Sequence, residues 1–327
     1  MVIQMNEFQF IDAIKPKTYK QPSLIKGIGD DAAVFRQTSQ DIVTAVDTFV
    51  EDIHFSTKTT EPEHIGYRAL AANISDLAAM GAKPAFYLVS ITIPKSSNLS
   101  RLQAIFQGMN QLAAEYQMDL IGGDTVSGRE LTISITVIGF VDHERVRYRH
   151  QAEPGDKVFV TGTLGDSRAG LYILQNDIEV KNREYFIRRH QMPTPRVAFA
   201  QALSSLTRVA LNDISDGIAN EASEIAEASK HPLFLDGDKI PVSQHFNQFS
   251  AERQRNWKLF GGEDFELLGT VPEKDWPLVQ SAAEQTNVQV TEIGYVGNPK
   301  EENDELVYLY ENAELRPLIK LGYDHLK

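Results

Sequence analysis

The feature that most constrains the fold is the alternation of strand-like and helix-like segments in the first half of the chain. Residues 41–50 are rich in β-branched side chains, as strands are, and a helical pattern then runs from a cap at Thr60 to a stop at Gly81. The alternation continues with an expected strand at 85–94, an expected helix at 100–116 and an expected strand at 130–141. Strands that alternate with helices predict an α/β domain.

A second α/β domain is expected after a cluster of turn residues that runs from Glu153 to Asp156. The 327 residues, 42% of them hydrophobic, provide apolar material for two cores, and two cores imply a cleft between them. We therefore place an N-terminal domain at residues 1–150 and a C-terminal domain at residues 151–327. In the second domain we expect helices at 165–175, 183–190, 194–206 and 215–230, and strands at 157–162, 208–213, 264–271, 288–296 and 305–310.

The composition excludes several kinds of site. The chain has no cysteine, which excludes disulfides, zinc–thiolate and iron–sulfur sites and thiol nucleophiles, and leaves oxygen ligands and histidine for metal binding. The formal net charge of −13 argues against nucleic-acid binding, which needs a basic face. No stretch reaches the roughly 18 unbroken apolar residues of a membrane span, and the first residues lack the order of a signal peptide. We therefore expect no membrane contact and a cytoplasmic location.

Six clusters of acidic residues beside glycines or hydroxyl residues carry most of the functional information. Each is expected at a strand end or at a helix start. Glycine lets a ligand approach the backbone closely, and carboxylates gathered in one place repel one another unless divalent cations neutralise them. Magnesium bound to a polyphosphate is the simplest neutraliser. The clusters are Gly29-Asp30-Asp31, Val46-Asp47-Thr48, Ser75-Asp76, Gly122-Gly123-Asp124-Thr125, Asp213-Ile214-Ser215-Asp216 and Gly261-Gly262-Glu263-Asp264.

Each cluster taken alone is also explained by local structure, because aspartate is common in turns and as a helix cap. Ser215 or Asp216, for example, is equally suited to cap the helix that follows. Asp76 is harder to explain in this way, because it lies three residues after Asn73 among alanines, whose small side chains leave room for an ion. The clusters together favour metal binding over capping.

The common nucleotide-binding motifs do not occur in the sequence. The chain has no P-loop sequence and lacks the H-R-D and D-F-G motifs of protein kinases. Residues 27–32 imitate a dinucleotide fingerprint, but no good strand precedes them and two acids would face the pyrophosphate. The eight histidines show no zinc-binding spacing. His54, just after the expected strand at 41–50, is the histidine of interest, and its alternative interpretation is an ordinary loop residue.

Eight successive segments together resemble the signature sequences of thiamine-monophosphate kinases, from about residue 27 to the end of the chain. The combination of HF after the expected strand with GGDT, DISDG and GGEDFEL distinguishes this family from its relatives, such as aminoimidazole ribonucleotide synthetase. In order, the segments are GIGDDAAVF, VDTFVEDIHF, NISDLAAMGAKP, GGDTVSG, VTGTLGDSRAGL, HQMPTPRV, DISDGIANEASEIAEAS and GGEDFELLGTVP.

The resemblance implies a two-domain α/β fold with mixed sheets, of the aminoimidazole ribonucleotide synthetase-like type, whose N-terminal domain dimerises through its strands into a barrel. It also implies ATP in the cleft with several Mg²⁺ ions, and the phosphorylation of thiamine monophosphate to thiamine diphosphate. Because the acceptor phosphate is already ionised at neutral pH, direct in-line transfer assisted by metal needs no catalytic side chain. The expected partners are therefore ATP, thiamine monophosphate and a second copy of the chain.

The resemblance assigns three groups of site residues, position by position. The magnesium ligands are Asp30, Asp47, Asp76, Asp124, Asp213 and Asp216. The ATP contacts are Phe106, Gly123, Asp124, Arg149 and Ser215. The thiamine monophosphate contacts are His54, Glu263 and Tyr323.

Two positions leave alternatives open. The family commonly has hydroxyl residues immediately before the aspartate at position 47, whereas this chain has Ala45 and Val46, so that a metal contact there is lost or is replaced by backbone or by Thr44. Arg147 is an alternative to Arg149 as the ATP contact.

Two other functions remain compatible with the sequence: another ATP-dependent synthetase of the same superfamily, and a non-catalytic ATP-binding module. Selenophosphate synthetase and the hydrogenase maturation protein usually rely on a cysteine, which this chain lacks.

Overall fold

The computed structural model describes residues 14–26, 34–36, 39–298 and 306–320. The chain forms two compact units. Unit 1 comprises Met1–Leu77 and Lys83–His143, and unit 2 comprises Ala78–Ala82 and Glu144–Lys327. Across the described ranges, no helix is long and apolar enough to cross a membrane.

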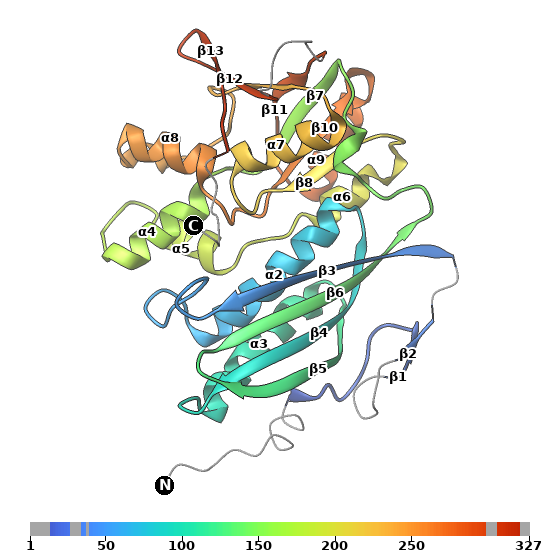
Figure 1. Cartoon of the computed structure of the whole chain (residues 1–327), viewed down its shortest axis with the longest axis vertical. Helices are drawn as coiled ribbons and strands as arrows, with labels where there is room; N and C mark the ends of the chain where they lie inside the picture. Colours follow the sequence, from blue (N-terminus) through green and yellow to red (C-terminus); the bar gives the residue numbers. More distant parts are fainter. Residues whose placement is uncertain (1–13, 27–33, 37–38, 299–305, 321–327) are drawn as a thin grey trace. The chain divides into compact units, whose positions relative to one another are not determined.

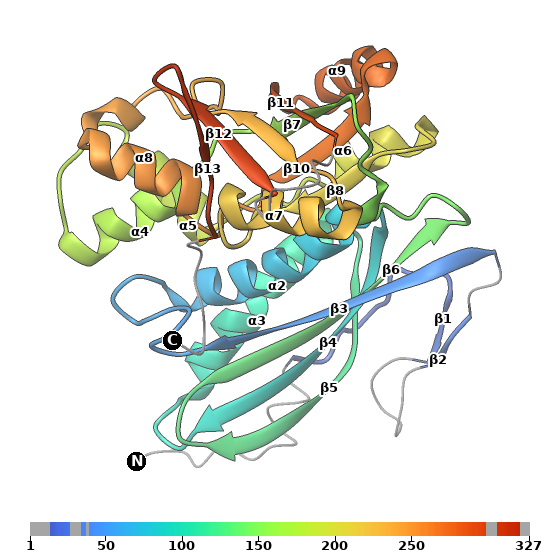
Figure 2. The same ribbon diagram turned by 45° about the horizontal axis from the view of Figure 1, so that its top comes forward.

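Unit 1 contains a four-stranded sheet in the order β3-β6-β4-β5. Neighbouring strands are antiparallel except for β4 and β5, which are parallel. Two helices, α2 and α3, cover one face of this sheet (Figures 1 and 2). A separate pair of short strands, β1 and β2, precedes it. The elements are β1 Leu24–Lys26, β2 Val34–Phe35, β3 Gln40–Val50, α2 Pro62–Ala79, β4 Lys83–Pro94, α3 Leu99–Glu115, β5 Asp119–Gly128 and β6 Thr132–Asp142.

The side-chain pattern of unit 1 shows that both faces of the sheet bury apolar residues, one under α2 and α3 and the other, in part, under β1 and β2. Phe35 of β2 lies 5.0 Å from the ring of Phe86 and 6.3 Å from that of Phe140. Ile133, Ile135 and Val137 of β6 are fully buried, and they alternate with half-buried hydroxyl residues that point to the other face. On that other face β3 leaves Ile42 and Val46 exposed, at 53% and 59%. Within the described residues this sheet is open and does not close on itself, so the barrel expected on dimerisation stays a prediction.

Unit 2 contains a seven-stranded sheet in the order β13-β12-β9-β11-β7-β10-β8. Its pairs are antiparallel except for β12 and β9. Its strands are β7 Asp156–Thr161, β8 Ala210–Asp213, β9 Leu233–Asp236, β10 Leu267–Pro272, β11 Val290–Val296, β12 Val307–Glu311 and β13 Glu314–Pro317. Its helices are α4 Asp166–Asn176, α5 Arg183–Gln191, α6 Val197–Ala202, α7 Ile218–Ser229, α8 Ala251–Phe260 and α9 Trp276–Thr286.

Both faces of this sheet carry helices, which gives unit 2 two apolar layers. On one face the buried side of α7, including Ile225, packs with Val158 and Val160 of β7 in one apolar core. On the other face Phe159 contacts the rings of Phe199 in α6 and Trp276 in α9. Successive side chains of β7 point to opposite faces of the sheet and so contribute to both cores, as expected for a strand buried on both faces.

The mixed α/β architecture with two units is confirmed, and the differences from expectation are local. Residues Gly122 to Thr125 were expected at a strand end or a helix start, but they lie inside β5, because this strand pairs with β4 along its whole length. The strand expected at 264–271 begins only at Leu267. Several elements have no counterpart in the sequence-based expectations: strands β1, β2, β5, β9 and β13 and helices α8 and α9.

Candidate functional site

Two carboxyl groups of unit 1 lie together where β3 faces α2. The side chain of Asp47 is within hydrogen-bonding reach of that of Asp76. The backbone N–H of Asp47 donates to Asn73 Oδ1 at 3.0 Å, and Asn73 Nδ2 donates to the carbonyl of Ala69 at 2.9 Å, which fixes the strand on the helix. Burial raises the pKa of Asp47, although the bond to Asp76 acts in the opposite direction. A divalent cation would let both acids ionise, so the donor set fits such an ion.

The alternation of side chains along β3 shows whether a neighbouring residue replaces the hydroxyl group that is missing at Ala45 and Val46. Side chains at odd positions share the face of Asp47, so Ala45 leaves no side-chain oxygen beside it. Thr44 points to the opposite face, where its hydroxyl donates to the carbonyl of Val137 at 2.9 Å. Thr44 is therefore not a substitute for the missing hydroxyl.

His54 is held in one orientation by its neighbours in unit 1. Its Nδ1 accepts a hydrogen bond from the backbone N–H of Val50 at 3.0 Å, and its ring lies 5.2 Å from that of Phe49. Its backbone carbonyl accepts from Arg68 at 2.8 Å, and Arg68 is only 1% exposed. Because Nδ1 is an acceptor, neutral His54 carries its proton on Nε2.

The other predicted contacts of unit 1 differ in their exposure. Gly123 and Asp124 lie in the exposed part of β5. A Cβ on Gly123 would lie 1.9 Å from the carbonyl oxygen of Val89, so only glycine allows the two strands to approach this closely. Phe106, in contrast, is 2% exposed and belongs to the buried side of α3.

In unit 2 the two loops that carry predicted site residues are joined by backbone hydrogen bonds. The acidic loop, residues 213–216, follows β8, and the second loop, residues 262–266, precedes β10. The N–H of Glu263 donates to Ser215 O at 2.7 Å, and the N–H of Phe265 donates to Ile214 O at 3.0 Å. A Cβ on Gly262 would lie 2.3 Å from Ser215 O, so the glycine pair beside Glu263 permits this contact.

The acidic loop is also held from α7. Glu221 is 2% exposed and accepts hydrogen bonds from the N–H of Asp216 at 2.8 Å and from Asn212 Nδ2 at 3.1 Å. Burial raises the pKa of Glu221 to about 9. Arg149 Nε donates to Asn212 Oδ1 at 3.0 Å, and its guanidinium also lies 3.0 Å from Glu224.

The two candidate arginines have different environments. The side chain of Arg149 is 50% exposed, so it is accessible to a ligand. Arg147 is 1% exposed, and its NH2 group donates to the carbonyl of Leu203 at 2.6 Å. The structure therefore favours Arg149 over Arg147 as a ligand contact.

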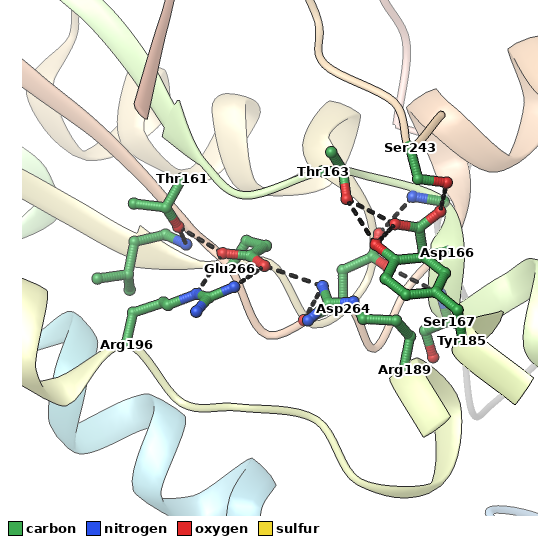
Figure 3. A network of polar contacts seen from close by, with 12 residues as sticks. Thr161, Thr163, Asp166, Ser167, Tyr185, Arg189, Arg196, Ser243, Asp264 and Glu266 are labelled. Carbon is green, nitrogen blue, oxygen red and sulfur yellow. Dashed lines mark hydrogen bonds and ion pairs between the residues drawn. The ribbon is translucent and has the colours of Figure 1, made fainter. Parts of the chain in front are cut away.

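A buried group of charged and polar side chains, which we call the Glu266 cluster, includes two residues of the 262–266 loop (Figure 3). It consists of Thr161, Arg189, Arg196, Asp264 and Glu266. Glu266 is fully buried, and both of its oxygens accept hydrogen bonds from arginines. Burial alone would raise its pKa, but Arg196 and Arg189 hold the pKa of Glu266 below the ordinary value.

The arginines of this cluster were not identified from the sequence. Arg196 lies in the HQMPTPRV segment and Arg189 directly before it, so a signal was present, but the segment alone does not tell which acid they meet. Both arginines bind Glu266, which lies 70 positions from Arg196 and 77 positions from Arg189 along the chain.

The predicted magnesium ligands are divided between the units. Asp47, Asp76 and Asp124 belong to unit 1, and Asp213 and Asp216 to unit 2. In the part of the chain that the structure describes, no group of three or more histidine or acidic side chains lies close enough to hold a metal ion. Asp30 and Tyr323 lie outside the described residues.

Two family models match most of the chain. The model described as AIR synthase related protein, N-terminal domain, matches residues 29–141, and that for the C-terminal domain matches residues 153–306. A thiamine-monophosphate kinase of Bacillus subtilis is 43% identical, over 99% of this chain and 100% of the relative.

Two solved structures are similar over nearly the whole chain. Thiamine-monophosphate kinase from Stenotrophomonas maltophilia K279a has a TM-score of 0.84 and 31% identity, covering 95% of this chain and 98% of its own. A structure described as AaThiL complexed with AMPPCP and TMP has a TM-score of 0.77 and 29% identity, covering 99% of this chain and 98% of its own.

The raised pKa values predict how stability depends on pH. The folded pKa values, about 9 for Glu221 and about 7 for Asp264, exceed the ordinary values of 4.5 and 3.8, in both cases because of burial. The folded chain thus keeps protons that the unfolded chain has lost, and this stabilisation disappears as pH rises through the folded values. In EDTA we expect the free energy of unfolding to fall between about pH 4 and pH 9, by up to about 1.4 kcal/mol per pH unit for each proton.

Urea denaturation at several pH values measures this dependence, and Asp264→Asn is the informative variant. Its profile should lose the contribution of Asp264, which falls between about pH 4 and pH 7, and keep the decrease that Glu221 causes up to about pH 9. A wild-type stability that is flat or rises across this range contradicts the expectation.

Proposed function

The chain belongs to the thiamine-monophosphate kinases of the AIR synthase related family, and from this premise we propose that it transfers the γ-phosphoryl group of ATP to thiamine monophosphate. The products are thiamine diphosphate and ADP. The observation that carries the proposal is the full-length similarity to a structure described as complexed with both AMPPCP and TMP, an ATP analogue and the acceptor.

We propose that the six predicted magnesium ligands bind the ions that neutralise the charge of the phosphates. Mg²⁺ supplies neutralisation of the phosphates of ATP and acceptor and aligns them for in-line attack. The contact between the carboxyl groups of Asp47 and Asp76, with the raised pKa of Asp47, supports this assignment, because a cation relieves both repulsion and burial. The other proposed ligands are Asp30, Asp124, Asp213 and Asp216.

The proposed ATP contacts are Phe106, Gly123, Asp124, Arg149 and Ser215. Arg149 is supported by its exposure and by its positive charge. Gly123 is supported as an ATP contact by its exposed position in β5. Phe106 has the weakest support, because its ring belongs to the buried side of α3. The proposed functional domains remain residues 1–150 and 151–327.

Direct transfer without a phosphorylated enzyme is proposed, because the acceptor oxygen is already ionised and needs no general base. His54, Glu263 and Tyr323 are the proposed acceptor contacts. The Nε2–H of His54 suits it to donate a hydrogen bond to the acceptor, not to remove a proton from it.

A turnover assay tests the function. Purified protein with ATP and Mg²⁺ should form thiamine diphosphate from thiamine monophosphate, but not from thiamine, and EDTA should abolish the reaction because the metal is required. An aminoimidazole precursor serves as the control for a superfamily synthetase. No protein-bound label should accumulate from γ-labelled ATP without acceptor. ATP binding without turnover of any acceptor would instead indicate a binding module.

Within the same assay, a pair of variants tests the metal assignment. Asp47→Asn should reduce kcat by about 100-fold or more, because an amide lacks the charge that the ion requires. Asp41→Asn, on the same strand, should retain activity, since Asp41 lies 2.8 Å from His143 at the surface. Equal activity of the two variants contradicts the role of Asp47.

Two substitutions of His54 distinguish the roles of its two ring nitrogens. His54→Asn keeps an acceptor near the position of Nδ1, where it can receive the Val50 N–H, but removes the donor at Nε2. His54→Gln keeps a donor near Nε2. We expect the Asn variant to raise the KM for thiamine monophosphate by about tenfold and the Gln variant to raise it less. Steady-state kinetics with varied acceptor measures both, and an unchanged KM in the Asn variant excludes this donor.

A homodimer is proposed at the exposed strand β3, on the face of the unit 1 sheet opposite α2 and α3. The alternating Ile42, Thr44, Val46 and Thr48 of β3 give this face exposed apolar and hydroxyl side chains without charge, which suits burial against a second copy. Ile42→Lys should dissociate the dimer, because it would bury an unpaired charge. Gln107→Lys, at an exposed position of α3, is the matched control. Sedimentation of the wild-type protein as a monomer would falsify the proposal.

A further inference from the structure

The backbone of the 262–266 loop adopts a conformation that its residues do not favour. Glu263 has φ of +67° and Phe265 has φ of +51°, both in the left-handed region that non-glycine residues avoid. Such conformations persist only where the surrounding structure imposes them. Something in unit 2 therefore holds this loop.

The residues between and after these two positions provide the restraint. Asp264 is 1% exposed, and its carboxylate accepts hydrogen bonds from the N–H groups of Gly165 at 2.6 Å and Ser167 at 3.0 Å. Glu266 is fully buried and accepts from Thr161 Oγ1 at 2.7 Å. The side chain of Glu263 is 31% exposed. The loop thus has two buried anchors, and the residue ahead of them is accessible.

The anchor at Glu266 depends on two arginines and one hydroxyl group (Figure 3). Arg196, directly before α6, donates from Nε at 2.6 Å and from its NH2 group to the other oxygen, which is a bidentate pair. Arg189 of α5 donates at 2.9 Å, and also reaches the carbonyl of Asp264 at 3.4 Å. Thr161 also accepts from the N–H of Leu267 at 2.8 Å, so one hydroxyl connects β7 to both Glu266 and the start of β10.

The acidic loop has an additional support that does not involve this cluster. The N–H of Asp216 donates to Glu221 at 2.8 Å, and Asn212 also donates to Glu221, at 3.1 Å. Loosening the Glu266 anchor should therefore displace Glu263 before it displaces Asp213, Ser215 or Asp216.

We propose that Thr161 and Arg196 are positioning residues for the acceptor, which act through Glu266 to hold Glu263 in its contact with thiamine monophosphate. The proposal rests on the proposed function. A cluster that serves stability alone would lower the melting temperature without a selective change in acceptor kinetics.

Thr161→Val and Thr161→Ser are the main pair of variants. Valine has nearly the same shape but lacks the hydroxyl that Glu266 and Leu267 use, whereas serine keeps it. For Thr161→Val we expect a KM for thiamine monophosphate raised by about tenfold, with the KM for ATP changed less than about twofold. Thr161→Ser should restore near wild-type values. Equal kinetics of Thr161→Val and wild type, or failure of serine to rescue, overturns the proposal.

A double-mutant cycle with Glu263 shows whether the effect passes through that residue. Arg196→Lys keeps the charge but loses the bidentate geometry, and should raise the acceptor KM about as Thr161→Val does. In a Glu263→Gln background it should add less than about a twofold change, because the group it positions is already lost. Full additivity, or a KM for ATP that rises equally, overturns the proposal.

Two controls make the outcome specific. Arg183→Lys, in the same helix as Arg189, should leave both KM values unchanged, since Arg183 pairs with Asp177 and Glu184 near the surface. Melting temperatures show that each variant is folded, and Thr161→Val serves alone if Arg196→Lys does not fold. Wild-type protein is assayed first: absence of turnover refutes the proposed function and with it this role, whereas normal turnover with unaffected variants refutes only the role.

Discussion

A carboxylate removed from water is stabilised by a positive partner, and unit 2 provides one from its own side chains. In unit 2, Glu266 receives hydrogen bonds from Arg189 and Arg196, so its charge is compensated permanently by the chain. In unit 1, Asp47 has the carboxyl group of Asp76 beside it, and burial raises its pKa. Fixed cations thus serve the anchor of a loop, whereas we propose that the acids assigned to magnesium are neutralised by ions that bind with the substrates.

The backbone hydrogen bonds between the two loops of unit 2 link the proposed acceptor contact to the proposed nucleotide contacts. The backbone bonds from Glu263 to Ser215 and from Phe265 to Ile214 place the proposed acceptor contact on the same support as the proposed metal and ATP contacts. Such a support keeps the reacting groups at constant separation, which is where in-line transfer gains most of its rate. The left-handed backbone at Glu263 is consistent with this, since strained conformations are commonly retained where function requires them.

The sequence was sufficient for the architecture and for the positions of most acids, because both depend on local patterns. Strand and helix periodicity predicted β3, α2, β4, α3 and β6 of unit 1, and glycine or hydroxyl neighbours marked the acidic clusters. Two features depended on long-range packing and were not accessible in this way. The sequence predicts Gly123 and Asp124 at a strand end or a helix start, whereas the pairing of β5 with β4 places them inside a strand. Arg196 has no local signal for its acid, because Glu266 is 70 residues away and becomes its partner only through the fold.

The charges near the proposed contacts also bear on the choice of acceptor. Arg149 lies 3.0 Å from Glu224, so the chain itself neutralises part of the positive charge available to a phosphate. An acceptor that already carries an ionised phosphate is compatible with this arrangement, because bound magnesium would supply the missing charge and no proton has to be removed. A hydroxyl acceptor would need a base, and His54 is poorly placed to be one, since its Nδ1 already accepts the Val50 N–H and its Nε2 holds the proton. The same hydrogen bond that orients His54 therefore favours a phosphate over an alcohol as the acceptor.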